Sequence, residues 1–219
     1  MDVPHLPLPE LEAELEHLAQ FVTDARKTRI EHVLAHRTRH IGVGLENIYQ
    51  PQNASAVLRT ADCFGIQDVH SIENTNKFYI STRVTHGADK WVDTYRHRHE
   101  DGENTQRCIN HLREKGYKIV STTLNNFTHT LGEVPIDDKF VLFFGTEATG
   151  ISDLLAEQSD YRMIIPMQGF TQSFNVSVSA AIALYRLTER MYSSDIKWQL
   201  SREEQLRIKH RWYKQITGL

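Results

Sequence analysis

The feature that most constrains the fold is an uninterrupted apolar run at residues 140–145, FVLFFG. A strand with apolar side chains on both of its faces is typical of the centre of a parallel sheet, where both faces are buried. Segments with strand-like and helix-like patterns alternate before and after this run. This alternation predicts an α/β domain whose parallel sheet is covered by helices on both faces.

Local patterns give the elements around the apolar run. Strands are expected at residues 41–48, 66–72, 91–95, 117–124, 140–145 and 161–167. Helices are expected at 51–65, at 103–115, from 152 onward and from about 175 to 193. Further helical patterns occur at 9–36 and 201–216. We therefore expect an N-terminal helical extension at 1–40, an α/β domain at 41–193 and a C-terminal helical extension at 194–219.

The apolar content, the N-terminal sequence and the cysteine count indicate where in the cell the protein is located. No run of eighteen apolar residues occurs in the sequence, so we expect no membrane span. The N-terminus has neither a basic start nor an apolar stretch, which argues against a signal peptide. Cys63 and Cys108 cannot build a disulfide framework, and we interpret both as buried small apolar residues. These features together predict a cytoplasmic protein.

Charge is unevenly distributed along the chain. The formal net charge of −3 argues mildly against a nucleic-acid partner, because a polyanion normally binds a basic surface. Residues 26–39 are nevertheless basic, and residues 207–214 place further basic side chains beside Trp212 and Tyr213. Two interpretations of these basic residues stay open. They form helix faces exposed to solvent, or they contact RNA from both extensions. The candidate RNA-binding residues are Arg26, Lys27, Arg29, Arg37, Arg39 and Arg211.

Four polar or glycine-rich loops follow expected strand ends, at residues 49–59, 121–126, 145–150 and 166–175. In open α/β sheets, ligands bind beyond the carboxyl ends of the strands, so these loops form the candidate site. The dinucleotide fingerprint GxGxxG does not follow any strand, and the phosphate-binding pattern GxxxxGKS/T is absent. A nicotinamide-dependent oxidoreductase and a P-loop ATPase are therefore not expected.

Three motifs stand in order in these loops. The first is Asn53 followed by Arg59 in NASAVLRTAD, and the second is Gly145 with Glu147 in FFGTEATGIS. The third lies in IIPMQGFTQSFNVSVS and consists of Ile165, Pro166, Met167, Ser173, Asn175 and Ser177. Over residues 41–191 or so, the arrangement resembles the TrmH (SpoU-like) branch of the SPOUT RNA methyltransferases. Phe174 departs from the Leu that tRNA-acting members often have, but it keeps the position apolar.

The resemblance implies a particular fold and a cofactor. The fold would be a SPOUT-type parallel sheet whose C-terminal third is threaded into a deep trefoil knot, a rare exception among proteins. The cofactor would be S-adenosylmethionine, held by the loops at 121–124, 145–150 and 165–174. The residues assigned to it are Thr122, Leu124, Gly145, Ile165, Met167 and Phe174. The resemblance also implies a homodimer that pairs through the helices at 53–65 and 175–191.

The implied reaction is methylation of a ribose 2′-hydroxyl in RNA. No His or Cys lies in the motifs, and the resemblance gives the activating role to Arg59. Because a guanidinium stays protonated in proteins, we interpret Arg59 as a fork that grips an RNA phosphate and stabilises the forming alkoxide. An ion pair with Asp62, one helical turn further on, is the alternative for Arg59.

Four other residues complete the expected catalytic group. Asn53 is expected to orient Arg59 or the ribose, or else to cap its helix. Glu147 is expected to accept hydrogen bonds from the backbone or from Asn175. Ser173 and Asn175 stand at the start of the last long helix of the domain, where exposed N–H groups favour an anionic ligand.

Within the family that the chain resembles, the expected substrate is a guanosine in the D-loop of tRNA. Members that act on ribosomal RNA usually carry a separate N-terminal RNA-binding domain, whereas only about 40 residues precede the core here. Ribosomal RNA is the alternative substrate, and a catalytically silent RNA-binding protein of the same fold is the alternative function. No metal site is expected. His97 and His99 alternate with Arg96 and Arg98, a pattern that no metal site requires.

Overall fold

The computed structural model describes residues 6–100 and 102–219, and the chain divides into two compact units. Arg39–Trp198 form the sheet unit, whereas Met1–Thr38 and Gln199–Leu219 together belong to the terminal unit. The two ends of the chain thus join in one unit instead of forming separate extensions. Within the described ranges, no helix combines the length and the apolar character that crossing a bilayer requires.

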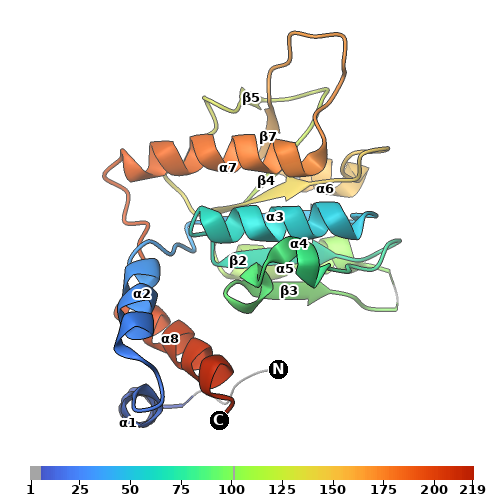
Figure 1. The fold of residues 1–219 in the computed structure, drawn as a ribbon. Helices are drawn as coiled ribbons and strands as arrows, with labels where there is room; N and C mark the ends of the chain where they lie inside the picture. The colour runs from blue at the N-terminus through green and yellow to red at the C-terminus, as the bar shows by residue number, and fades with distance from the viewer. Residues whose placement is uncertain (1–5, 101) are drawn as a thin grey trace. The chain divides into compact units, whose positions relative to one another are not determined.

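The sheet unit is built on a seven-stranded parallel sheet (Figure 1). Its strands are β1 Ile41–Glu46, β2 Asp68–Ile72, β3 Asp93–His97, β4 Lys118–Thr122, β5 His129–Thr130, β6 Phe140–Phe144 and β7 Tyr161–Ile164. They are ordered β3-β2-β1-β6-β4-β7-β5, and each neighbouring pair is parallel. The predicted parallel sheet is confirmed, and β6, formed by the apolar run, is its central strand.

Helices cover both faces of this sheet. They are α3 Pro51–Cys63, α4 Thr82–Thr85, the 3₁₀ helix η1 Ala88–Lys90, α5 Asn104–Glu114, α6 Asp153–Gln158 and α7 Val176–Tyr192. α3 and α7 lie side by side and share one core cluster with the sheet, whereas α5 packs with α6 in another (Figure 1). The predicted helices at 51–65, 103–115, 152 onward and 175–193 are confirmed to within about two residues.

The central strand explains why β1 carries glycine. Successive side chains of β6 point to opposite faces, so Leu142 joins the cluster with α3 and α7 while Phe143 joins the cluster with α5. The ring of Phe143 lies over Gly44, and a Cβ on that residue would come within 2.2 Å of the ring. Large side chains on β6 therefore require a bare backbone on the neighbouring strand.

Two short elements differ from the expectation. The strand expected at 91–95 is β3, which begins at Asp93, because Trp91 ends the 3₁₀ helix η1. β5 was not expected, since it has only two residues and pairs with β7, more than thirty residues later in the chain. Neither feature has a periodic pattern long enough to be recognised in the sequence.

Over residues 6–38 and 199–219, the terminal unit contains three helices, α1 Leu8–Ala19, α2 Asp24–Leu34 and α8 Arg202–Thr217. α8 begins with a capping box, in which Ser201 and Glu204 exchange side-chain and backbone hydrogen bonds. Trp212 of α8 is buried and receives the guanidinium of Arg37 over its ring at 5.4 Å. Because α8 packs against α1, each end of the chain supplies part of the other's core.

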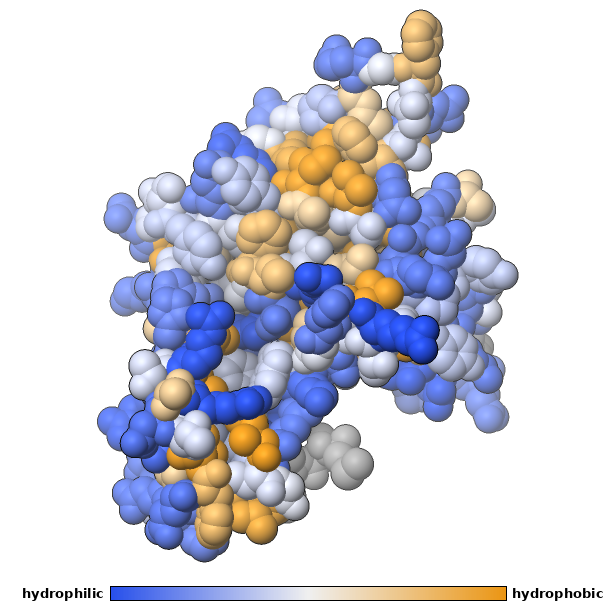
Figure 2. Space-filling view, viewed as in Figure 1, coloured by the Kyte–Doolittle hydropathy of each residue, from blue (hydrophilic) through white to orange (hydrophobic). Residues whose placement is uncertain are grey.

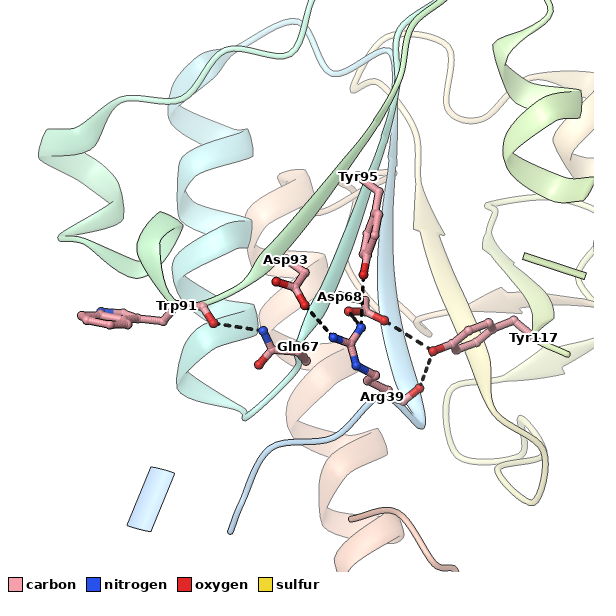
Figure 3. Close-up of polar contacts among 7 residues, drawn as sticks. All are labelled: Arg39, Gln67, Asp68, Trp91, Asp93, Tyr95 and Tyr117. Atoms are coloured by element: carbon pink, nitrogen blue, oxygen red, sulfur yellow. Dashed lines mark hydrogen bonds and ion pairs between the residues drawn. The ribbon is translucent and has the colours of Figure 1, made fainter. Parts of the chain in front are cut away.

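A buried ionic cluster stands where the sheet unit begins (Figure 3). The guanidinium of Arg39 contacts the carboxylates of Asp68 and Asp93 and donates a hydrogen bond to the Tyr95 hydroxyl at 3.2 Å. The Tyr117 hydroxyl donates to the backbone oxygen of Arg39 at 2.9 Å. Burial raises the pKa of Asp68 to about 6, against the opposing effect of Arg39. This cluster fastens the first residue of the unit to β2 and β3.

Replacing Arg39 with Met should therefore destabilise the protein, because two buried carboxylates would lose their counterion. We expect the free energy of unfolding at pH 8 to fall by about 3–5 kcal/mol. The loss should be smaller at pH 5. The pKa of Asp68 is raised in the folded protein, so at this pH its carboxyl group binds a proton and no longer needs a counterion. Urea denaturation at both pH values measures this, and the exposed Arg29→Met is the control. An equal loss at both pH values would contradict the role given to Asp68.

Candidate functional site

A cavity of about 580 Å³ opens at the carboxyl ends of the strands, within the usual range for small-molecule sites. Segments following β4, β6 and β7 line it, together with the start of α7. All six residues predicted to bind a cofactor are in its lining: Thr122, Leu124, Gly145, Ile165, Met167 and Phe174. Two of the predicted catalytic residues, Glu147 and Ser173, line it as well. Loops that are far apart in the sequence therefore meet around one cavity.

The loop between β6 and α6 doubles back on itself. Thr146 and Gly150 exchange two backbone hydrogen bonds of 3.0 Å, and Gly150 has a positive φ of 71°. This return brings the backbone of Gly150 against Gly145, where a Cβ would lie 2.0 Å from the Gly150 carbonyl carbon. Gly145 is thus required by the close approach of two backbone segments.

A buried carboxylate fixes the end of this loop. Glu46, the last residue of β1, is 1% exposed and accepts hydrogen bonds of 2.7 Å from the backbone N–H and the hydroxyl of Ser152. Its carboxylate also accepts a 2.7 Å bond from the hydroxyl of Thr105. Ser152 is the N-cap of α6, so Glu46 sets the point where the loop becomes a helix.

Asn53 connects the loop to α7. Its side-chain amide donates to Glu147, and its carbonyl oxygen accepts a 3.2 Å bond from the amide of Asn175. Asn175 is the N-cap of α7 and accepts from the backbone N–H of Ser177 at 2.9 Å. Three of the predicted catalytic residues therefore form one hydrogen-bonded chain, Glu147–Asn53–Asn175.

Two details of this chain differ from the expectation. Asn53 does not cap α3, because it is the third residue of that helix and Gln50 holds the N-cap position. Glu147 receives its side-chain hydrogen bond from Asn53 and not from Asn175, which bonds to the other end of the same amide. Asn53 is buried between the two, at 7% exposure, so its amide is held in one orientation.

Arg59 is not part of the hydrogen-bonded series Glu147–Asn53–Asn175. It lies six residues after Asn53 on α3, a rise of roughly 9 Å along the helix. The side chain is exposed, does not line the cavity and makes no hydrogen bond or ion pair with any residue that the structure describes. The alternative ion pair between Arg59 and Asp62 is accordingly not formed. A guanidinium in this state is available to a ligand or a partner.

The cavity rim exposes apolar side chains. Leu124 and Phe174 are 46% and 42% exposed, and both line the cavity. Exposed apolar groups beside a hollow are typical of ligand-binding surfaces. Arg162 and Glu157 also line the cavity, and sequence reasoning did not select them because they lie outside the recognised motifs. Glu46 could have been found in the sequence as the charged residue that ends an otherwise uncharged strand pattern.

The six predicted RNA-binding residues have different environments. Arg26 and Arg29 are exposed on α2, while Lys27 is partly exposed and pairs with Asp24 at 3.0 Å. Arg211 is partly buried on α8. Arg37 and Arg39 are not placed to contact a phosphate. Arg37 is only 1% exposed and lies over the ring of Trp212, and Arg39 is held by buried carboxylates.

Comparisons with known proteins give consistent matches. A family model described as the SpoU rRNA methylase family matches residues 40–185. The chain is 40% identical over 200 residues to a tRNA (guanosine(18)-2′-O)-methyltransferase of Borreliella burgdorferi, spanning 91% of this chain and 89% of the relative. A protein of the same name from Thermus thermophilus is 35% identical over 74% of this chain and 81% of its own length.

Solved structures give the same match. The crystal structure of an A. aeolicus TrmH/SpoU tRNA modifying enzyme has a TM-score of 0.74 with 28% identity, over 94% of this chain and 98% of that one. The SpoU methyltransferase AviRb of Streptomyces viridochromogenes, solved with the cofactor AdoMet, has a TM-score of 0.63. That match covers 74% of this chain and 64% of the other, and at 21% identity it supports the fold alone.

The doubled-back loop allows a matched test. Gly145→Ala should destabilise the protein by about 1–3 kcal/mol, because the added methyl group collides with the Gly150 backbone. Gly132→Ala is the control, since nothing lies within 4 Å of its Cβ position, and its effect should stay within about 0.5 kcal/mol. Chemical denaturation measures both, and equal stability of the two variants would contradict the packing of this loop.

Proposed function

Because the chain belongs to the SpoU rRNA methylase family, we propose that it transfers a methyl group from S-adenosylmethionine to the 2′-oxygen of guanosine 18 in tRNA. The observation that carries the proposal is the series of hydrogen bonds Glu147–Asn53–Asn175, which joins all three motifs next to one cavity. A binding module with no reaction to perform does not need this arrangement. The 2′-O-methyltransferase relatives match along most of their length.

The cavity fits the proposed cofactor in size and in chemistry. S-adenosylmethionine supplies an electrophilic methyl group on a sulfonium centre. The backbone that doubles back at Gly145 offers polar groups for the edge of an adenine, and Leu124, Ile165 and Phe174 offer apolar contacts for its faces. Thr122 and Met167 complete the proposed set. Ser173, between the cavity and the start of α7, would contact the reacting part of the ligand.

The ribose hydroxyl must lose its proton as the new bond forms. Because a guanidinium group does not give up its proton in proteins, Arg59 acts in this proposal as a hydrogen-bonding fork. It would grip an RNA phosphate and stabilise the developing negative charge, while a phosphate oxygen or water accepts the proton. Its exposure and its lack of partners among the described residues support this role.

The proposal includes a homodimer. Arg59 does not line the cavity of its own protomer, so a second copy that brings Arg59 to the site would complete it. Hydrophobic side chains gather on the surface near α7 (Figure 2). Val178 and Tyr185 of this helix are 44% and 59% exposed. Ala180 and Ala183 are fully buried within the protomer, so the small residues of α7 serve its packing on α3.

We also propose the trefoil knot that the family resemblance implies. β7 is inserted between β4 and β5, two strands that precede it in the chain. The connection from β4 to β5 must therefore pass around β7, which supports threading of the later segment through the earlier loop. The proposed cytoplasmic location agrees with Cys63 and Cys108, which are not joined in a disulfide. Cys108 is buried as expected, whereas the expectation was wrong for Cys63, which is exposed.

The favoured substrate is tRNA. The names of the relatives that match over most of this chain specify guanosine 18 of tRNA as the modified nucleotide. The description of the family model specifies ribosomal RNA instead. Arg26 and Arg29 of the terminal unit are exposed and would contact the phosphates of the tRNA body. Ribosomal RNA stays the second candidate because of the family's description.

The reaction is tested on an unmodified tRNA transcript. After incubation with enzyme and S-adenosylmethionine, alkaline hydrolysis should leave one gap in the ladder, at guanosine 18, because a methylated ribose cannot attack its adjacent phosphate. A transcript with adenosine at position 18 is the control and should give a complete ladder. A complete ladder from tRNA beside a gap in ribosomal RNA fragments would favour the second candidate, and complete ladders from both would overturn the proposal.

The role of Arg59 is tested by two substitutions. Arg59→Ala and Arg59→Lys should both lower the single-turnover rate by roughly 10²- to 10³-fold, because a point charge does not replace a planar fork. Calorimetry with S-adenosylhomocysteine should show unchanged affinity, since Arg59 does not line the cavity. The exposed Arg83→Ala is the control and should retain full activity. Substantial activity of the Lys variant would mean that only a positive charge is required.

A further inference from the structure

Three metal-ligating side chains meet in the sheet unit outside the cavity. They are His70 on β2, His97 on β3 and Cys108 on α5, and none of them lines the cavity. One potential ligand atom from each lies within 4.8 Å of the other two. His70 is 2% exposed and Cys108 is fully buried, whereas His97 is partly buried. Two adjacent parallel strands and the helix packed on them therefore converge on one point.

The buried histidine of this cluster has an unsatisfied ring nitrogen. Nδ1 of His70 lies 3.3 Å from Nε2 of His97, which accounts for one of its two ring nitrogens. Nε2 of His70 is buried and has no hydrogen-bond partner among the described residues. A buried polar atom without a partner is costly and rare in folded proteins. His70 therefore has a ring nitrogen whose need for a partner the protein does not meet, in a side chain that lies beside two other metal-ligating groups.

The protonation states suit metal binding. Burial, with His111 as the next cause, lowers the pKa of His97 to about 4, and burial also lowers the pKa of His70 well below its ordinary value. An imidazole binds a metal through the lone pair of a neutral ring nitrogen, and a thiol binds it as the thiolate. Burial raises the pKa of the Cys108 thiol, so this ligand must lose a proton when it binds.

We propose that His70, His97 and Cys108 form a site for one divalent transition-metal ion of the zinc class. Two imidazoles and one thiolate are ligands that Zn²⁺ prefers, and they fill three of four tetrahedral positions. His111 follows Cys108 by three residues on α5, hence on the same helix face, and its ring centroid lies 5.8 Å from that of His97. His111 or water would take the fourth position. The ion would tie α5 to β2 and β3.

Nearby charges set the affinity of this site. The ammonium of Lys115 lies 5.3 Å from the ring of Tyr95, which stacks on His70 at 4.8 Å, and it acts electrostatically on His70 and His97. Arg39 acts on His70 in the same sense. Both cations oppose metal binding, whereas Glu46, which acts on Cys108, favours it. Lys115 is exposed, so its charge can be removed without disturbing the core.

Calorimetric titration of the chelator-treated full-length protein with Zn²⁺ tests the site. We expect one tight site per chain and release of about one proton, from Cys108, seen as a heat that depends on the buffer. His97→Gln should weaken binding at least about tenfold. His99→Gln, which changes an exposed histidine two residues further on, should bind as the unaltered protein does. Equal affinity of the two variants would overturn the proposal, as would the absence of a tight site.

Co²⁺ in place of Zn²⁺ reports the ligands directly. The protein should show a near-ultraviolet thiolate-to-cobalt absorption that Cys108→Ser abolishes and His99→Gln retains. Lys115→Gln should increase the affinity for Zn²⁺, since it removes a repelling charge. Circular dichroism establishes that each variant is folded. A cobalt complex of the unaltered protein without thiolate absorption would exclude Cys108 as a ligand and overturn the site.

Discussion

The carboxylate of Glu46 is paired with no cation among the residues that the structure describes, and three hydrogen bonds of 2.7 Å hold it at the end of β1. A buried carboxylate is tolerated only where such donors replace water, so Thr105 and Ser152 cannot move away from it without a large cost. Thr105 lies in the first turn of α5 and Ser152 is the N-cap of α6, and these two helices pack on the same face of the sheet. The start of both helices is thereby set by a single side chain of the sheet.

The loop from Gly145 to Ser152 is held from both sides for this reason. Glu46 fixes its end, and Asn53 on the opposite layer contacts Glu147 in its middle. The mutual bonds between Thr146 and Gly150 close the loop between these two anchors. Loops are in general more mobile than the elements that they connect, and the two anchors allow this one to present a defined surface to the cavity that it lines.

The sequence predicts the elements that local patterns determine. The apolar run at Phe140–Phe144 is expected only in the centre of a parallel sheet, where both faces of a strand are buried. The N-termini of α6 and α7 are predicted from their capping residues, Ser152 and Asn175. Arg39 and β5 could not be placed in this way. The carboxylates that hold Arg39 lie 29 and 54 residues away, and β5 is a strand only because β7 arrives beside it.

The motifs identify residues of the site, but the sequence does not predict which of these residues are joined by hydrogen bonds. Asn53 has an amide with one donor end and one acceptor end, and only the fold determines that Glu147 and Asn175 occupy these two ends. The same limit applies to the histidines. His97 looks like one of several exposed basic residues along β3, and only the pairing of β3 with β2 brings it to His70.

The described lining of the cavity contains no histidine or cysteine, and its acidic residues are Glu147, Asp153 and Glu157. Glu147 already accepts a hydrogen bond from Asn53, so its use as a base would disrupt the chain that joins the motifs. In the proposed reaction the protein therefore contributes position and charge stabilisation, and the proton leaves through the RNA or the solvent. Such a site needs rigid loops more than it needs a tuned pKa, which is the property that Glu46 and Asn53 supply from opposite faces of the sheet.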